Sequence, residues 1–430
     1  MIELGLRAAI TSDARQIIEN LYNDRELYPD DEPAKPPETR YKSRSIEVNT
    51  IFGTIQLTRN YYHHYPSKTG RAPLDEKLQL EGKYTPALAR IICRAASMSP
   101  SFEQGSTDLS AFAGIEVNPR QFGRLAHAIA PDLNKALVTI TNPETPQELE
   151  IPILYIECDG TGTPMRKDEL VGRKGKQKDG SSKTREAKLG CVFTQTLTDM
   201  EGMPIRDPNS TSYVGTYENC RGLAVILHQE AQRRGLSHAK KIVCLGDGAA
   251  WIWNNFELTF PNAIQILDFY HASEYVMKMA GQIHPEDEEK AKALYQKWKA
   301  GMKKNSPKKL ISEARLLLSQ HPEWSKLRRD EIESKISYLE SHASRTNYGE
   351  YRTQGYFIGS GVIEAGCKTV VGGRLKQSGM FWSKPGAENI LGMRCLYLGQ
   401  DLDRVWKKAQ ELKAIVKQKA RRWLPGKKIA

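Results

Sequence analysis

The sequence predicts an α/β protein in which a mixed β-sheet with flanking helices is interrupted by a long helical segment. Two nearly continuous apolar runs, residues 151–158 and 241–246, end directly before Asp159 and Asp247. This pattern favours two buried strands, each with a carboxylate at its end. Residues 273–356 are rich in Lys and Glu and show helical rather than strand patterns, which indicates a helical insertion within the sheet-forming domain.

Length and composition limit the classes of protein to which this chain can belong. At 430 residues the chain is long enough for two or three domains, each with its own buried core. No uninterrupted apolar stretch approaches the roughly 20 residues that span a bilayer, and the first residues lack the layout of a signal peptide. The seven cysteines are scattered and never spaced as Cys-x-x-Cys, so a zinc ribbon or a disulfide framework has no support. We therefore expect a folded cytoplasmic protein.

The charge balance points to a polyanionic partner. The chain has 63 Lys and Arg against 51 Asp and Glu, a net charge of +12 and a pI near 9.2. Such an excess favours nucleic acid first and an acidic membrane surface second. We expect a protein that associates with DNA in the nucleoid.

The first 44 residues predict a helix followed by a linker. Residues 6–22 can form a helix. Residues 30–37 are charged and contain three prolines, which cannot continue that helix.

Residues 45–145 predict a DNA-binding domain that combines a β-hairpin with helices. The alternating runs 45–50 and 54–59 flank a glycine-containing turn and form the hairpin. His63 and His64 follow it, but neither a cysteine nor a second pair of histidines lies at metal-ligand spacing. A packed or phosphate-contacting strand end is therefore favoured over a metal site there.

A helix, a tight turn and a second helix follow in the order of a helix-turn-helix motif. Residues 108–113 form the first helix and residues 114–117 the turn, and Asn118 caps a helix that begins at Pro119. An ordinary helical hairpin explains this pattern equally well. If the motif binds DNA, the exposed start of its second helix offers Arg120, Gln121 and Arg124.

Residues 150–272 predict the first part of the sheet-forming core. The strand that ends at Asp159 pairs with strands at 187–196 and 213–215 as a meander, and a helix spans 220–234. A fifth strand covers 263–268.

The remainder of the chain completes this core. After the insertion, residues 357–403 bring a glycine-flanked helix start at 359–364, which carries Glu364, and a helix that runs on from there. Residues 404–430 form a basic C-terminal tail, with ten Lys or Arg and one Glu between 404 and 428.

Asp159, Asp247 and Glu364 form a candidate catalytic set. Side chains at the strand ends of an open sheet point into a shared crevice, so residues distant in sequence can meet there. Carboxylate oxygens suit Mg²⁺ or Mn²⁺, and a pair of such ions can support both hydrolysis and transesterification of a phosphodiester. Each Asp-Gly pair taken alone is more often a turn, and paired carboxylates also suit sugar hydrolysis. The basic charge favours a nucleic acid substrate over a sugar.

Four ordered motifs, at residues 157–161, 245–253, 267–271 and 359–364, make a family resemblance specific. The sequence resembles the DDE transposases of bacterial insertion sequences, and most closely the ISKra-type group. This resemblance implies an RNase H-like catalytic core with Asp159, Asp247 and Glu364 as both catalytic triad and metal ligands, and two Mg²⁺ or Mn²⁺ ions per site.

The resemblance also implies roles outside the triad. Asp268 and His271 match a signature that precedes the insertion, and either orient the site or fix the corner between strand and helix. The partners it implies are transposon ends with terminal inverted repeats, target DNA, and further copies of this chain in a dimer or larger assembly. The alternatives are a nuclease of the same fold that does not join DNA, and a domesticated DNA-binding protein.

Basic residues close to these motifs are candidate contacts for DNA phosphates. Trp382 could stack on an unpaired base or pack in the core. The candidate DNA-binding residues of this part of the chain are Arg173, Lys174, Lys176, Lys368, Arg374, Lys376 and Trp382.

Overall fold

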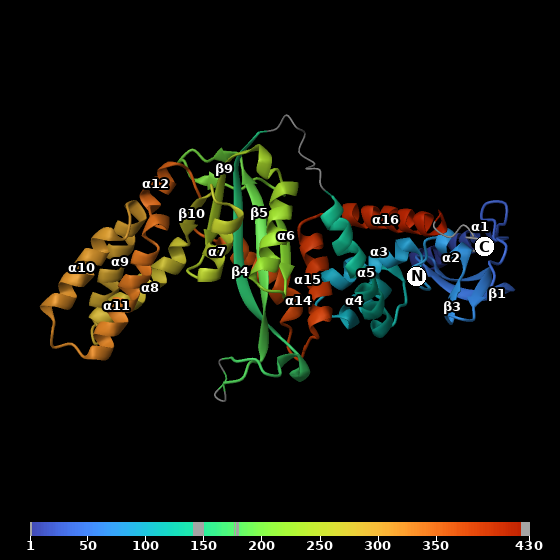
Figure 1. The fold of residues 1–430 in the computed structure, drawn as a ribbon, viewed down its shortest axis with the longest axis horizontal. Coiled ribbons are helices and arrows are strands. Elements are labelled where there is room, and N and C mark those ends of the chain that lie inside the picture. The colour runs from blue at the N-terminus through green and yellow to red at the C-terminus, as the bar shows by residue number, and fades with distance from the viewer. Residues whose placement is uncertain (1, 141–149, 176, 178–179, 423–430) are drawn as a thin grey trace, which may run out of the picture. The chain divides into compact units, whose positions relative to one another are not determined.

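The computed structural model describes residues 2–140, 150–175, 177 and 180–422, with side chains up to residue 414. The chain forms two compact units. Unit 1 comprises Met1–Leu137 and Leu402–Ala430, and unit 2 comprises Val138–Asp401. Figure 1 gives the labels of the elements.

Unit 1 begins with helix α1 (Ile2–Asn23) and a sheet formed by β1 (Glu38–Thr50), β2 (Gly53–His64) and β3 (Thr69–Arg71). The predicted helix and hairpin are confirmed, and both strands are longer than expected. Asn23 attaches α1 to β2, because its side-chain amide donates to the Gln56 carbonyl at 2.8 Å and its Oδ1 accepts from the Thr58 N–H at 2.9 Å.

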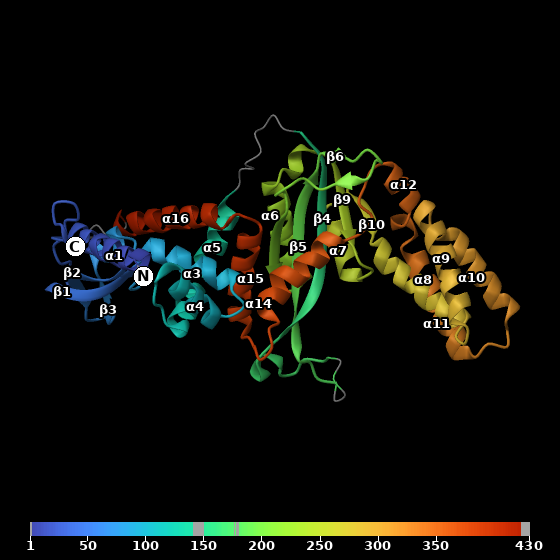
Figure 2. The same ribbon diagram turned by 180° about the vertical axis from the view of Figure 1, so that it is seen from behind.

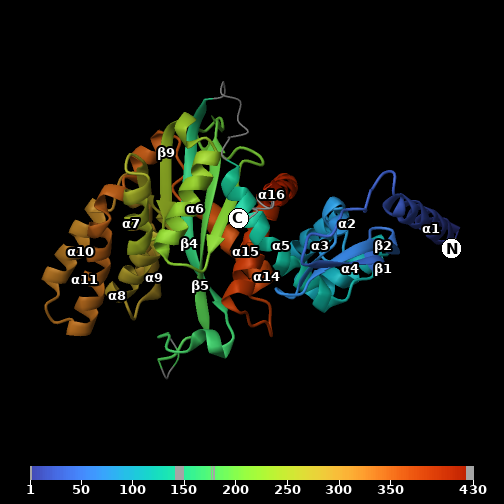
Figure 3. The ribbon, with the colours of Figure 1, turned by 45° about the vertical axis from the view of Figure 1, so that its right-hand side comes forward.

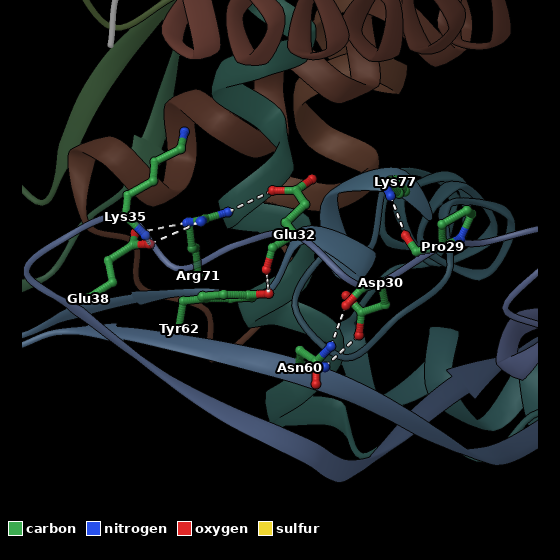
Figure 4. A network of polar contacts seen from close by, with 9 residues as sticks. All are labelled: Pro29, Asp30, Glu32, Lys35, Glu38, Asn60, Tyr62, Arg71 and Lys77. Carbon is green, nitrogen blue, oxygen red and sulfur yellow. Dashed lines mark hydrogen bonds and ion pairs between the residues drawn. The ribbon is translucent and has the colours of Figure 1, made fainter. Parts of the chain in front are cut away.

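The predicted linker lies against this sheet through several polar contacts (Figure 4). The Arg71 guanidinium binds the Glu38 carboxylate, with Nε 2.9 Å from Oε1, and contacts Glu32 Oε2 at 3.1 Å. The Tyr62 hydroxyl donates to the Glu32 carbonyl, and Asn60 bonds to both the side chain and the backbone of Asp30. The charged residues of the linker therefore fasten it to the sheet.

The helices of unit 1 include the predicted helix-turn-helix arrangement. α2 (Pro73–Lys77) and α3 (Pro86–Met98) precede α4 (Phe102–Ala113) and α5 (Pro119–Thr139). Gly114 ends α4 in the left-handed conformation with φ 67°, which glycine adopts without strain. Asn118 Oδ1 accepts from the Arg120 N–H at 2.9 Å, and α5 begins at Pro119 as expected.

The C-terminal segment differs from the expected basic tail. It forms helix α16 (Leu402–Arg422), which belongs to unit 1. Val405, Trp406 and Ala409 are buried, and Lys413 Nζ lies 3.0 Å from Asp132 Oδ2 and also contacts Glu81. Basic residues dominate the composition of this segment, but its apolar residues recur every three to four positions. They form one face of an amphipathic helix, and that face packs within unit 1.

Unit 2 contains a five-stranded mixed sheet in the order β10-β9-β4-β5-β8. β4 (Ile151–Pro164), β5 (Thr184–Gln195) and β8 (Ser212–Thr216) form the predicted antiparallel meander. β9 (Ala239–Gly246) runs parallel to β4 on its other side, and β10 (Ile264–Leu267) runs parallel to β9. A small second sheet of β6 (Leu197–Thr198) and β7 (Pro204–Ile205), which was not predicted, connects β5 to β8.

Helices cover both faces of this sheet. α6 (Cys220–Arg233) and α7 (Ala250–Thr259) lie on one face, and Leu227 of α6 fills the space above Gly190 of β5 (Figure 3). On the opposite face lie α13 (Gly361–Gly366), a π-helical segment η4 (Cys367–Gly372), α14 (Gly373–Leu375) and α15 (Lys384–Leu398) (Figure 2).

The helical insertion is present between β10 and α13 and starts earlier than expected. It comprises α8 (Phe269–Ile283), α9 (Glu288–Lys304), α10 (Lys308–Gln320), α11 (Lys326–Ser341) and α12 (Tyr348–Thr353). Asp268 caps α8 through a hydrogen bond from the His271 N–H, so the helix begins directly after β10. Among the described helices, none is long and apolar enough to cross a membrane.

Candidate active site

Asp159 lies inside β4, five residues before the strand ends at Pro164. The sequence placed it at the end of a strand, because the apolar run stops at Cys158, whereas pairing with β5 continues through polar residues. Asp159 pairs with Leu189, on the sheet face that α13 and η4 cover. Its Oδ1 accepts from the Gly160 N–H at 2.6 Å, and the Cys367 thiol lies 3.4 Å from Oδ2.

Asp247 follows β9 directly, as expected. Glu157 of β4 pairs with Leu245 of β9, and the same register extended by two residues brings Asp247 level with Asp159. Neighbouring strands lie about 4.8 Å apart. Asp247 Oδ1 accepts from the Ala249 N–H at 2.8 Å, which fixes the turn into α7. The two aspartates therefore come from adjacent parallel strands.

Glu364 approaches this pair from α13. Burial raises the pKa of its carboxyl, and the charges of Asp268 and Asp159 raise it further. The pKa of Asp159 is also raised, mainly by burial and further by Asp247. Asp159 thus lies within electrostatic range of both Asp247 and Glu364.

Two buried carboxylates hold the start of α13. Glu157, which is 0% exposed, accepts a hydrogen bond from the Ile363 N–H at Oε2, with a distance of 2.8 Å. Asp268, which is 1% exposed, accepts from both the N–H and the hydroxyl of Ser360, the latter at 2.6 Å. Ser360 Oγ in turn lies 3.4 Å from Glu364 Oε1. These contacts fix the start of the helix that carries Glu364.

Sequence reasoning missed Glu157. The available signal was a carboxylate at the penultimate position of an otherwise apolar run, in a strand expected to be buried on both faces. Burial raises the pKa of Glu157 to about 8, because Ile363 supplies only one hydrogen bond and Asp268 and Glu364 add negative charge.

The structure places Asp268 and His271 at the junction of β10, α8 and α13. Asp268 fixes the corner between strand and helix and also tethers α13. The His271 ring lies against Tyr275 and Tyr338, with ring centroids 5.5 and 6.5 Å away.

Lys376 and Lys368 lie near the carboxylates, whereas Lys188 points to the other face of the sheet. Lys188 pairs with Gly160, contacts the Glu186 carboxylate, and lies 5.0 Å from the centre of the Trp251 ring of α7. Lys376 donates to the Thr161 hydroxyl, and Lys368 opposes the rise in the pKa of Glu364. Acidic groups in the centre with cations around them suit a metal-bridged phosphate ester.

The chemistry of these side chains fits a divalent cation. A cation would relieve the mutual repulsion that contributes to the raised pKa values of Asp159 and Glu364. Across the described residues, no three or more His, Cys, Asp or Glu side chains are already arranged to hold a metal. Asp159 instead turns toward its own backbone and Cys367.

The candidate DNA-binding residues of unit 1 are exposed. Arg120, Gln121 and Arg124 lie on the first turns of α5. Arg120 and Arg124, together with Phe102 and His127, line a hollow of about 710 Å³. His64 of the same unit bonds through Nδ1 to the Ser67 hydroxyl at 2.6 Å.

In unit 2, four of the predicted contacts, Arg173, Lys174, Lys368 and Lys376, are exposed, and Lys176 lies outside the described residues. Arg374 and Trp382 do not fit the expected role, because both side chains are buried. Trp382 Nε1 donates to the Leu375 carbonyl at 3.1 Å, and the Arg374 guanidinium lies 5.1 Å from the centre of its ring. Burial lowers the pKa of Arg374 to about 10.

The likeness of this chain to known proteins is distant. No family model matches the chain, and no curated protein matches it either. Among solved structures, the Drosophila P element transposase strand transfer complex is similar over 74% of this chain and 80% of that chain, with 9% identity and a TM-score of 0.26. Similarity at this level carries no functional argument, so function has to be argued from the residues of the site.

Proposed function

We propose that this chain is a DNA transposase of the DDE class, which cuts DNA and joins the resulting ends to a target. One observation carries the proposal. Asp159 lies on β4, Asp247 directly follows the adjacent parallel strand β9, and Glu364 lies on a helix that Glu157 and Asp268 hold in place, close enough for the charge of Asp159 to raise its pKa.

The order of the strands supports an RNase H-like core. Three antiparallel strands, β8, β5 and β4, are followed on the other side of β4 by two parallel strands. In such a core the central strand and its parallel neighbour each supply one acidic residue. Here β4 carries Asp159, and β9 leads directly into Asp247.

The residues present define the chemistry of the proposed reaction. Two Mg²⁺ or Mn²⁺ ions held by Asp159, Asp247 and Glu364 would supply activation of the attacking oxygen and stabilisation of the leaving oxygen. Lys376 contacts Thr161, two residues after Asp159 on the same face of β4, where it would bind the DNA backbone. Glu157 and Asp268 act on Glu364 through α13, as positioning residues.

The partners in this proposal are the transposon ends, recognised at their terminal inverted repeats, and target DNA. The exposed first turns of α5 in unit 1 support a role for Arg120, Gln121 and Arg124 in binding the ends. A dimer or larger assembly of this chain would pair two ends, and such a protein would act in the nucleoid.

The test is cleavage and joining of a labelled duplex that carries the sequences flanking the gene. The wild type is compared, with and without Mg²⁺ or Mn²⁺, with Asp159→Asn, Asp247→Asn and Glu364→Gln, which preserve side-chain shape. Glu201→Gln, in an exposed turn, is the matched control. We expect metal-dependent cutting and strand transfer in the wild type and the control alone, with DNA binding retained in all.

The other outcomes assign the alternatives. Cutting at the ends without strand transfer would make the protein a nuclease. Equal binding by all five proteins without cutting would leave a DNA-binding protein without catalysis.

A further inference from the structure

A basic hollow with an aromatic wall lies in unit 2, where β4 and β5 extend beyond the helices. Its volume is about 960 Å³, at the upper end of the roughly 300–1,000 Å³ of small-molecule sites. It is lined by the short helix η1 (Lys167–Leu170), the loop that follows it, and Phe381 from the segment before α15.

Backbone hydrogen bonds hold the walls of this hollow together. The Arg166 N–H donates to the Trp382 carbonyl at 2.9 Å, and the Trp382 N–H donates to the Pro164 carbonyl at 3.2 Å. Glu169 accepts at Oε1 from the Lys384 N–H at 2.9 Å, and its carbonyl accepts from Arg185 Nη2 at 2.8 Å. The segment that carries Phe381 is therefore fixed against the end of β4.

Within that wall the two neighbouring aromatic residues point in opposite directions. Trp382 is buried against Leu375, whereas Phe381 is 64% exposed. Val171, on the loop after η1, is 83% exposed. Phe381 and Val171 therefore give the hollow an apolar surface that is open to solvent.

Cations gather around this apolar surface. Arg166, Lys167, Arg173, Lys174 and Lys183 all line the hollow. Within the described part of the chain, no carboxylate forms an ion pair with any of the five, whereas the neighbouring Arg185 pairs with Glu169. Their charge is therefore available to an anionic ligand.

We propose that this hollow binds an unpaired nucleobase of single-stranded DNA, with the base stacked on Phe381 and the adjoining phosphates bound by the lysines and arginines. The chemistry selects this ligand, because an aromatic face can stack on a base only when that base is free of its own duplex neighbours. The strand that ends at this hollow also carries Asp159, five residues earlier. At about 3.3 Å per residue the separation is roughly 17 Å.

This inference rests on the proposed function, since it assumes that DNA is the polyanion. A strand opened at the carboxylates could extend along β4 and place an unpaired base against Phe381. Binding of duplex DNA by its backbone alone, or of an acidic lipid surface, would use the same cations without requiring an aromatic ring.

The experiment measures binding by the full chain in EDTA, so that no cleavage occurs. The probes are a ten-nucleotide single strand carrying one 2-aminopurine, the same sequence as a fully paired duplex, and vesicles of equal parts phosphatidylserine and phosphatidylcholine. The variants are Phe381→Ala, Phe381→Tyr and the double variant Lys167→Ala with Lys183→Ala. Met200→Ala, which removes a fully exposed apolar side chain outside the hollow, is the control.

We expect Phe381→Ala to weaken binding of the single strand by roughly 5- to 150-fold, the range for loss of one stacked base, and to abolish 2-aminopurine quenching. Phe381→Tyr and Met200→Ala should bind like the wild type, and binding of the duplex should not change. The double lysine variant should weaken binding of both DNA forms and lower its salt dependence.

Three results would overturn the proposal. They are unchanged binding of the single strand by Phe381→Ala, an equal loss on the duplex, and a Phe381-dependent preference for vesicles. Failure of the cleavage test with intact quenching would remove the proposed function and leave this site. Successful cleavage with no effect of Phe381→Ala would support the proposed function and remove this site.

Discussion

The carboxyl oxygen Oε2 of Glu157 accepts a hydrogen bond from the backbone N–H of Ile363 at 2.8 Å, although 206 residues separate the two in sequence. Glu157 lies two residues before Asp159 on β4, and Ile363 precedes Glu364 on α13. One buried bond thus couples the strand of the first candidate ligand to the helix of the third.

Two substitutions of Glu157 should show whether its side chain acts as a hydrogen-bond acceptor. Because burial raises its pKa to about 8, the group carries a proton at neutral pH, and Glu157→Gln keeps the oxygen that Ile363 needs. Glu157→Ala leaves a buried N–H without a partner, which costs about 1–3 kcal/mol. Urea unfolding should show this loss of unfolding free energy in Glu157→Ala and little loss in Glu157→Gln.

If Glu157 positions Glu364, the same two variants should also differ in the metal concentration that cleavage requires. Glu157→Ala should need a higher Mg²⁺ or Mn²⁺ concentration for half-maximal DNA cleavage, and Glu157→Gln should resemble the wild type. An unchanged metal dependence in Glu157→Ala, with only its stability lowered, would make Glu157 a structural residue and nothing more.

His342 should make unit 2 sensitive to acid. Its side chain is buried beside Trp253 and Tyr338, and burial together with the charge of Arg345 lowers its pKa. Above about pH 6.5 the ring is neutral in both the folded and the unfolded chain. Below that pH the unfolded chain binds a proton that the folded chain does not, so the free energy of unfolding falls as pH falls.

The measurement is urea unfolding between pH 5 and pH 7. His342→Gln should reduce the dependence on pH, whereas Gln320→Ala, which removes an exposed side chain without a titratable group from the same unit, should not. Equal slopes in all three proteins would show that His342 does not titrate on unfolding.

Helix α16 should be required for the stability of unit 1. Trp406 is 6% exposed and Val405 is 0% exposed, so Trp406→Ala should cost about 3–5 kcal/mol through lost burial and the cavity it leaves. Lys407→Ala, at the exposed neighbouring position, is the control. Hydrogen exchange should rise in α3 and α5 of the Trp406 variant only. A rise confined to α16 would mean that the rest of unit 1 folds without it.

The sequence predicted the elements that obey a clear periodicity. The apolar run before Asp159, the run before Asp247 and the glycine turn between α4 and α5 all lie where expected. Local patterns do not show where a strand ends once its partner continues, which is why Asp159 was expected at a strand end. Composition likewise could not show that α16 packs in unit 1.

The site was predictable only in its outline. The carboxylates could be named because each follows a recognisable pattern, but burial is a tertiary property that a single sequence does not contain. Arg374 and Trp382 belong to a segment rich in basic and aromatic residues, and only the fold shows that Trp382 turns inward while Phe381 turns outward. Glu157 was missed for the same reason.

The first turns of α5 should contribute to DNA binding through charge. Arg120 and Arg124 are exposed at the start of a helix whose N-terminus also favours anions. If each contacts one phosphate, Arg120→Ala and Arg124→Ala should each weaken DNA binding and reduce the slope of log affinity against log salt by about 1. Lys135→Ala, which removes an exposed cation near the far end of the same helix, is the control and should leave both quantities unchanged.

A sequence-specific role of these arginines requires more, namely that an arginine variant loses affinity for the terminal repeats and keeps its affinity for unrelated duplexes. An equal loss on both kinds of DNA would assign these arginines to the backbone, and no loss on either would make α4 and α5 an ordinary helical hairpin.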